Sequence, residues 1–478
     1  MKINNTFLSF CLAALLFSSC VDAPSNGEFI SPDYEGVAVP RNIAPLNFHY
    51  GEKGLKGAVT TFSAGDVTVR MRGRAVVWRE GDWRRLLDAA AGGSVRVLSS
   101  LRTASGRESR QWSFDVLEST VDPYLTYRLI EPGYEVWDDV SIVERCVENF
   151  DETVLSDYAR TDNKCMNCHI HARGRGDLSM FYLRGQGGGA ILNRDGQLRK
   201  LTLRDSAMIS STVYGELHPD GRFGVFSTNV IIPGFHTEPG LRLEVFDTAS
   251  DLCVADFDNN RMITTDLVSD PGALETFPAF SADGQSVYYC VAPARDLPDD
   301  IRNLKYSLVR ADFNPETGEI GPRIDTLWSA SGHGASVCHP KASPDGRWLM
   351  YTVADYGTFP IWHQECELQL MDLQSGETFD LQAVSADRSD TYHSWSSDSG
   401  WFLFASKRGD GQYGKPYFSH VGADGVATKP FVLPQKDPYF YDFFLKSFNI
   451  PDLGRESVGF DAEDIGRVWR EVEAEPFE

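Results

Sequence analysis

The sequence predicts an all-β protein in which an N-terminal β-sandwich-like domain precedes a β-propeller of five or six blades. One sequence unit recurs in the second half of the 478-residue chain at intervals of about 60 residues, which is typical of repeat architectures. Strand-like segments that end in Asp lie between the copies of this unit. The chain also contains 42 Gly and 24 Pro, with frequent Asp-Gly pairs, and this composition favours many short strands joined by tight turns.

The repeated unit is an apolar residue, then Ser-Pro-Asp-Gly or a near copy, then a hydrophobic strand. Its four clear copies are residues 217–223, 280–285, 342–347 and 395–400. The Asp-ended strands between them are residues 243–247, 308–312 and 368–372. Two hairpins per repeat make a four-stranded blade, with Asp-Gly in the tight turn of the first hairpin. A hairpin at residues 191–196 makes a fifth copy, and a sixth copy is either degenerate or shared between segments.

Residues 32–150 are predicted to form the N-terminal β domain. The strand-like segments in it are residues 67–71, 95–98, 110–114 and 125–129. Residues 82–91 begin with an Asp that can cap a helix and are followed by two glycines, so they predict a short helix.

Residues 1–19 have the features of a lipoprotein signal peptide. Lys2 supplies a positive charge, and the apolar stretch at residues 7–17 is too short to span a bilayer. Small residues precede Cys20, which resembles a lipobox in which this cysteine is lipidated. The alternative is an ordinary secretory signal with an incidental cysteine. Residues 20–31 then read as a polar tether.

These features predict an outer membrane lipoprotein that faces the periplasm, with the cell surface left open. Attachment to the membrane is expected through the N-terminal lipid, because no other segment is apolar enough to cross a bilayer. The formal net charge of -23 argues against nucleic acid as a partner, since phosphate contacts need clustered Lys and Arg. An envelope protein complex or a redox protein is the expected partner.

Seven cysteines remain once Cys11 has left with the signal and Cys20 carries lipid. Five of them are irregularly spaced: Cys146, Cys253, Cys290, Cys338 and Cys366. An odd, irregular set does not predict a disulfide framework, although a single pair is left open. Most are expected to be small, buried apolar residues.

The other two cysteines belong to Cys165-Met166-Asn167-Cys168-His169, in a predicted connector at residues 151–178. In an exported protein this spacing is typical of attachment of one haem c. The thiols of Cys165 and Cys168 would form thioethers with the porphyrin, and His169 would bind the iron. A zinc site that also uses His169 or His171 is an alternative, but no second Cys/His pair supplies the missing ligand. The other alternative is that Cys165 and Cys168 form a reducible disulfide.

Several residues are candidates for the second axial ligand of such a haem. Met180, Tyr182 and His218 follow the motif closely enough to be candidates, whereas His171 is too near in sequence to reach the opposite face. The alternative for Tyr182 is a strand residue packed in a blade.

Alignment of the repeats places four residues at equivalent positions ahead of the repeat aspartate: Tyr214, Phe277, His339 and Tyr392. We expect them near the mouth of the propeller channel, where ligands or partners dock. The alternative is that they pack between blades. A metal site in the channel would need several of five histidines (His218, His236, His333, His363 and His393), but none has a metal-binding spacing.

Residues 392–398 and 404–411 resemble the blade signature of TolB-like, WD40-like repeat propellers. The whole chain after residue 30 is similar to a family of Gram-negative lipoproteins that join an N-terminal β domain, a single Cys-x-x-Cys-His and this propeller. The supporting phrases are residues 42–48, 127–135, 275–278, 361–365 and 431–435. That family often has a histidine at the position of Tyr182, so this departure from the family pattern allows a five-coordinate iron or an iron with a different ligand.

The function expected from these features is that of an envelope lipoprotein with one covalently bound haem c, active in electron transfer or redox sensing. The propeller, residues 179–435, would be a docking platform, and residues 436–478 would close it. A haem-free propeller scaffold that binds envelope proteins or glycans is the alternative. A glycan-active enzyme on the propeller is less favoured, because no catalytic motif is present.

Overall fold

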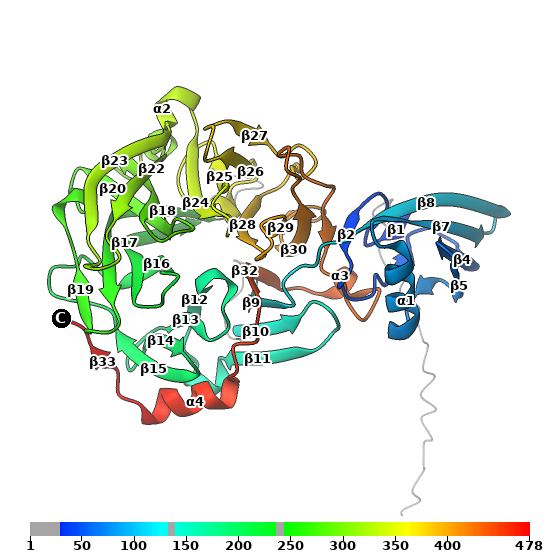
Figure 1. Ribbon diagram of the computed structural model, residues 1–478, viewed down its shortest axis with the longest axis horizontal. Helices are drawn as coiled ribbons and strands as arrows, with labels where there is room; N and C mark the ends of the chain where they lie inside the picture. Colours follow the sequence, from blue (N-terminus) through cyan, green and yellow to red (C-terminus); the bar gives the residue numbers. More distant parts are fainter. Residues whose placement is uncertain (1–28, 132–138, 236–242) are drawn as a thin grey trace, which may run out of the picture.

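The computed structural model describes residues 29–131, 139–235 and 243–478 (Figure 1). The predicted signal peptide, the lipidation site Cys20, most of the tether and His236 lie outside the described residues. Within the described ranges, no helix has the length and apolar character needed to cross a membrane.

The N-terminal part contains two sheets and one helix. Its strands are β1 (Ile30–Ser31), β2 (Ala38–Pro40), β3 (Phe48–Tyr50), β4 (Gly57–Ala64), β5 (Val67–Gly73), β6 (Ala75–Val76), β7 (Gly93–Arg102) and β8 (Arg107–Leu117). They pair in the orders β2-β8-β7-β4-β5 and β1-β3-β6. Helix α1 (Glu80–Ala90) buries Trp83, Leu86, Leu87 and Ala90. The predicted helix and the strands predicted at residues 67–71, 95–98 and 110–114 are confirmed, whereas the strand at residues 125–129 forms in a different sheet.

The other described strands form six sheets set around a common centre, the arrangement of a β-propeller (Figure 1). One sheet contains β9 (Tyr124–Ile130), β10 (Ser141–Cys146), β11 (Glu152–Asp157) and β32 (Ser447–Gly454). The next contains β12 (Met166–His171), β13 (Leu178–Leu183), β14 (Gly189–Arg194), β15 (Gln197–Thr202) and β33 (Glu475–Pro476).

Four more sheets follow in chain order, each with four strands. They are β16 (Thr212–Leu217), β17 (Phe223–Phe235), β18 (Leu243–Asp256) and β19 (Arg261–Ile263); β20 (Ala273–Phe280), β21 (Ser286–Pro293), β22 (Ser307–Phe313) and β23 (Ile320–Trp328); β24 (Ser336–Ala342), β25 (Trp348–Ala354), β26 (Glu367–Asp372) and β27 (Thr378–Asp380); and β28 (Asp390–Trp395), β29 (Trp401–Ser406), β30 (Lys415–His420) and β31 (Phe431–Val432). Each of the four clear repeats therefore forms one four-stranded sheet, as predicted, whereas the fifth copy at residues 191–196 lies in the five-stranded sheet that contains β14 and β15.

The Asp-Gly turns lie inside the first hairpin of a sheet, and their side chains explain the repeated sequence. Between β24 and β25, Asp345 accepts hydrogen bonds from the Ser343 hydroxyl at 2.6 Å and from the Arg347 amide at 3.0 Å. Gly346 has φ +76°, a left-handed conformation that glycine adopts without a steric cost. Ser281 and Asp283 repeat the first of these bonds, also at 2.6 Å.

The structure differs from the predicted domain boundaries near residue 150. Strands β9, β10 and β11, at residues 124–157, form a sheet with β32 from the C-terminal segment. The Cys-x-x-Cys-His motif was expected in a connector, but Met166–His171 form strand β12. Strands β9 and β32 pair in one sheet although they are far apart in sequence. For example, Arg128 of β9 donates a hydrogen bond at 2.7 Å to Asn449 of β32, 321 positions later.

The N-terminal part and the propeller share one hydrophobic cluster. It includes Trp83 and Phe114 from the first and Trp401 and Phe418 from the second. Short helix α3 (Phe440–Phe443), in the aromatic run of the C-terminal segment, packs against this cluster. Helix α2 (Ala330–His333) precedes β24. Helix α4 (Ala462–Glu471) begins with a capping box at Asp461.

Candidate functional site

Strand β12 carries the motif and contains a β-bulge. Asn167 pairs with Tyr182 and Ile170 pairs with Met180, so Cys168 and His169 together face a single residue of β13. The φ of Cys168 is +54°, which is uncommon for a residue other than glycine. Bulges re-aim side chains, and here the bulge directs the second half of the motif toward the centre of the molecule.

The same bulge recurs in one terminal strand of each of the other five sheets around the centre. The register shifts fall between Thr212 and Gly215, Thr276 and Ala279, Cys338 and Lys341, Thr391 and Ser394, and Asn449 and Asp452. Four of these bulges also have a positive φ, at Phe277, His339, Tyr392 and Ile450. Cys168 is thus structurally equivalent to these four residues.

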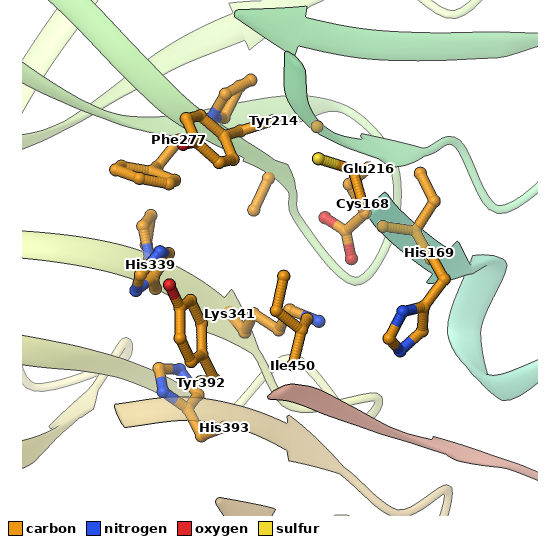
Figure 2. Close-up of a pocket in the computed structure, with 15 residues that line it drawn as sticks. Cys168, His169, Tyr214, Glu216, Phe277, His339, Lys341, Tyr392, His393 and Ile450 are labelled. Carbon is orange, nitrogen blue, oxygen red and sulfur yellow. The ribbon is translucent and has the colours of Figure 1, made fainter. Parts of the chain in front are cut away.

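The bulges surround a cavity of about 80 Å³, called here the inner cavity (Figure 2). Four of the residues around it are Tyr214, Phe277, His339 and Tyr392, which the sequence analysis aligned. Their rings touch in succession, with centroid separations of 4.4 Å, 4.1 Å and 4.7 Å. Cys168 and Ile450 also line this cavity.

Three histidines line the inner cavity, and each has a buried Nδ1 with no hydrogen-bond partner: His169, His339 and His393. The Nε2 atom of His169 lies 3.3 Å from the Thr126 carbonyl, and that of His393 lies 2.9 Å from the Met350 carbonyl. Burial lowers the pKa of both imidazoles to about 3. Burial also holds the pKa of His339 well below its ordinary value. All three rings are therefore neutral at pH 7.

Charged side chains lie beside these histidines. Asp452 accepts from the His171 amide and lies 3.1 Å from the His171 Nδ1, and it is 3.7 Å from the Lys341 ammonium. Burial opposes ionisation of Asp452, but Lys341 and His171 hold its pKa well below the ordinary value. Glu216 accepts from the Phe280 amide at 2.6 Å, and burial raises its pKa.

The sequence analysis did not single out Glu216, Lys341 or Asp452. Each lies two residues after a residue of the cavity wall: Tyr214, His339 and Ile450. Because strand side chains alternate in direction, this spacing is the signal that could have identified them.

A second, larger cavity of about 380 Å³, called here the mouth cavity, shares Cys168 with the inner cavity. Both Cys165 and Cys168 border it. Its other walls are mainly apolar and include Val213, Ile231, Val245, Phe359, Ile361 and Trp362, with the basic residues Arg128, Arg184 and Lys407. Burial raises the pKa of the Cys168 thiol, and the nearby Arg184 and Arg128 partly offset that effect.

The motif residues can be tested for their fit to a haem. The two thiols fit covalent attachment, because both border one apolar cavity. His169 does not fit as an iron ligand in the position described here, because it lines the inner cavity instead, with its Nε2 beside Thr126. The three motif residues therefore do not converge on one haem-sized space.

The structure separates the three candidates for the second axial ligand. Met180 and Tyr182 are buried on β13, in the same apolar cluster as Cys168. The Tyr182 hydroxyl is hydrogen-bonded to Thr212, and burial raises its pKa. His218 borders neither cavity, and its Nε2 lies 3.0 Å from the Gly284 carbonyl.

Of the cysteines outside the motif, Cys253 belongs to the same apolar cluster as Cys168. The seven cysteines of the described ranges are all free, and Cys253, Cys290, Cys338 and Cys366 are buried. In the part of the chain that the structure describes, no three His, Cys, Asp or Glu side chains are grouped to hold a metal ion. His333 stacks on Trp328, with ring centroids 4.2 Å apart.

The chain matches no protein-family model and no curated protein. Its fold is similar to that of TolB from Acinetobacter baumannii, at 12% identity and a TM-score of 0.43, over 78% of this chain and 85% of that one. A putative TolB from Agrobacterium tumefaciens is similar at 12% identity and a TM-score of 0.38, over 66% and 92%. The β-propeller domain of the Trilobed protease from Pyrococcus furiosus is similar at 8% identity and a TM-score of 0.34, over 68% and 77%. These similarities concern the fold alone.

Proposed function

We propose that this chain is an envelope lipoprotein whose TolB-like propeller carries one haem c on Cys165 and Cys168. In this proposal the six sheets are six blades, and β32 closes the ring by joining the blade that contains β9. The lipid on Cys20 holds the protein at the outer membrane, facing the periplasm. The N-terminal sheets form the sandwich-like domain that precedes the propeller.

The observation that carries the proposal is that both motif thiols border the mouth cavity. Thioether attachment needs two cysteines that reach one porphyrin edge, and the mouth cavity offers the mainly apolar surroundings that such a group prefers. Arg184 and Lys407 also border this cavity. Their positive charges suit the propionate groups that a porphyrin carries.

The proposal requires the iron ligand, His169, to change position. His169 must leave its contact with Thr126 and turn toward the mouth cavity. The ring makes a single 3.3 Å polar contact and its Nδ1 has no partner, so such a change would break only one hydrogen bond. When bound, a haem would supply one-electron chemistry. The role proposed for the protein is therefore electron transfer or redox sensing, with the propeller as the docking platform for its partner.

The test compares protein made with and without cytochrome c maturation machinery. The visible absorption spectrum of the first sample should show a haem c, and that of the second should not. Cys165→Ala and Cys168→Ala should each weaken covalent attachment, whereas Cys146→Ala, outside the motif, should leave it unchanged. A spectrum without haem in both samples would overturn the proposal.

A second candidate is a haem-free propeller that binds an envelope protein or a glycan. The inner cavity favours it, because aromatic side chains and three histidines line it. Chromatography of the mature protein over immobilised envelope proteins and glycans separates this candidate from the first. Retention by protein made without the maturation machinery supports the haem-free candidate, and the absence of retention removes it. A glycan-active enzyme remains the third proposal, and glycan degradation is the assay for it.

A further inference from the structure

We propose that one face of the N-terminal sheet binds the anionic headgroups of the membrane that anchors the protein. The sheet is β2-β8-β7-β4-β5, and the side of it opposite helix α1 is called here the outer face. The inference rests on the lipid attachment proposed for Cys20, which brings a membrane close, and it does not depend on haem. Such binding would set the orientation of the propeller relative to the bilayer.

The outer face is basic because apolar and charged residues alternate along its strands. Val69 of β5 and Val95 and Val97 of β7 are buried in the hydrophobic cluster that contains Trp83 and Leu86 of α1. Side chains alternate in direction along a strand, so the residues between these valines lie on the outer face. Five arginines of this face are exposed, namely Arg70, Arg72, Arg96, Arg102 and Arg107. Figure 1 shows the strands that carry them at the end of the molecule away from the centre of the propeller.

These five arginines have no carboxylate partners. Among the described residues, no ion pair includes any of them, whereas Arg347 in the propeller lies 3.3 Å from Asp372. Within the described strands of the sheet, the outer face has one carboxylate, Asp115, which accepts a hydrogen bond from the Ser94 hydroxyl at 2.5 Å. The guanidinium groups are therefore free to donate to an external anion.

The arrangement of two of the arginines opposes folding. Arg102 and Arg107 pair directly across the β7–β8 hairpin, on the same face of the sheet. Like charges in that position destabilise a sheet, so the stability of the fold does not explain them. Bound phosphate groups would neutralise both charges. This pair is a second observation, separate from the lack of carboxylates, that indicates an anionic partner.

The charge of the N-terminal part differs in sign from that of the rest of the chain. Residues 30–117, which contain β1 to β8 and α1, include 13 Arg and Lys and 9 Asp and Glu, a net charge of +4. The whole chain has a net charge of -23, so the other residues together carry -27. An anionic surface attracts the first part and repels the second. Both effects favour one orientation, with the outer face on the membrane and the propeller away from it.

The length of the tether makes the membrane the nearest anionic surface. Nine positions separate Cys20 from Phe29, and nine residues span at most about 30 Å. The Phe29 ring lies 4.4 Å from the guanidinium of Arg110, a residue of β8, so the tether ends at this sheet. A lipid on Cys20 would therefore hold the sheet within reach of the headgroups. Its short linker also gives the face a high effective concentration at the bilayer, so a weak affinity is enough.

The shape of the outer face fits a planar array of anions better than one small ion. Arg96 and Arg102 lie on the same strand six residues apart, which corresponds to about 20 Å. Arg70 and Arg72 lie two strands away, on β5. A single phosphate ion contacts one or two of these side chains, whereas the headgroups of a bilayer can contact all of them. Guanidinium groups also match the geometry of phosphate oxygens.

The experiment uses residues 21–478, made without the signal peptide, so that neither lipid nor haem is present. Sedimentation with vesicles measures the partition coefficient. The protein should bind vesicles of equal parts phosphatidylglycerol and phosphatidylcholine at about 0.1 M salt, and it should not bind vesicles of phosphatidylcholine alone. Binding should be lost at about 1 M salt, because the Debye length falls from about 10 Å to about 3 Å. These measurements use the wild type, so they do not depend on whether a variant folds.

Arg70→Gln combined with Arg72→Gln should weaken vesicle binding about 25-fold, at about fivefold for each arginine near the surface. Arg85→Gln combined with Arg323→Gln is the matched control. It removes the same charge from α1 and from β23, outside the outer face, and should bind as the wild type does.

The proposal is overturned if both kinds of vesicle bind the protein equally, or if the two double variants bind alike. It is also overturned if the outer face binds soluble heparin but no vesicle. Dimerisation that the Arg70 and Arg72 substitutions abolish in sedimentation velocity, without vesicle binding, would assign the face to a second copy of the chain and would likewise overturn it. None of these results bears on the haem test, and the mass of the N-terminal peptide from the native host tests lipidation of Cys20 separately.

Discussion

Cys168 and His339 occupy the same position in two different sheets. Each is the first residue of a bulge in a strand that lines the inner cavity, with φ values of +54° and +51°. The Cys-x-x-Cys-His motif is therefore built into the propeller wall. Cys165 and Cys168 open toward the mouth cavity, and His169 lines the inner one. Because one short motif is divided between two cavities, the haem proposal requires His169 to change position.

The positive φ of Cys168 predicts a backbone effect that Cys165 does not share. Cys168→Val should lower the free energy of unfolding by about 1–3 kcal/mol, because a β-branched residue is strained at this φ. Cys165→Val, in the same motif, should change it by no more than about 0.5 kcal/mol. Urea unfolding of both variants measures the difference, and equal stabilities would contradict the bulge geometry.

The closing strand predicts a large effect at Phe448. This side chain is 2% exposed and packs on Tyr127 of β9, with ring centroids 4.8 Å apart. Phe448→Ala should destabilise the protein by about 3–5 kcal/mol. Phe443→Ala, at a residue that is 60% exposed, is the matched control and should be nearly neutral. If the two variants melt alike in urea, β32 does not hold the sheet together.

His363 predicts a loss of stability at alkaline pH. Its ring lies 3.2 Å from both Glu244 and Glu365. Burial opposes protonation, but the two carboxylates prevail and raise the pKa of His363 to about 9. A folded-state pKa above the unfolded value of about 6.5 gives stability that is present below about pH 6.5 and is lost as the pH rises through 9.

The free energy of unfolding of the wild type should therefore fall by roughly 3 kcal/mol more between pH 6 and 10 than that of His363→Gln. His333→Gln, on helix α2, should follow the wild type. Denaturant titrations at a series of pH values give these curves. Parallel curves for the wild type and the His363 variant would show that the imidazole is not charged in the folded state.

Asp452 predicts the opposite dependence on pH. A carboxyl whose folded-state pKa is depressed gives stability that is present above the unfolded pKa of about 3.9 and is lost as the pH falls. Asp452→Asn should cost about 3–5 kcal/mol at pH 7, because it leaves the buried partners of the carboxylate uncompensated. Asp299→Asn, at an exposed loop residue, is the control. A neutral effect of Asp452→Asn would contradict the pairing with Lys341 and His171.

The local parts of this fold could be predicted from the sequence, because they depend on neighbouring residues. The turn at Asp345-Gly346 is one example, since the Asp345 carboxylate accepts from residues within two positions and Gly346 supplies the positive φ. The helix at Glu80–Ala90 is another. The sheet that joins β9 to β32 could not be predicted, because no local pattern links residues more than 300 positions apart.

The candidate site was predictable only in part, for the same reason. Tyr214, Phe277, His339 and Tyr392 precede similar turns, so alignment of the repeats brought them together. Cys168 belongs to the same wall but was not aligned with them, because a turn at Arg173-Gly174, without Asp-Gly, follows β12. The spacing of the motif also fixes which residues are neighbours in the chain but not which cavity His169 faces.

The most direct test of the proposed function is mass spectrometry of the mature protein from its native host, on the peptide that contains Cys165 and Cys168. The account predicts one tetrapyrrole bound to that peptide through both sulfurs. Two free thiols and no added tetrapyrrole mass would contradict it and leave the haem-free propeller as the explanation of the site.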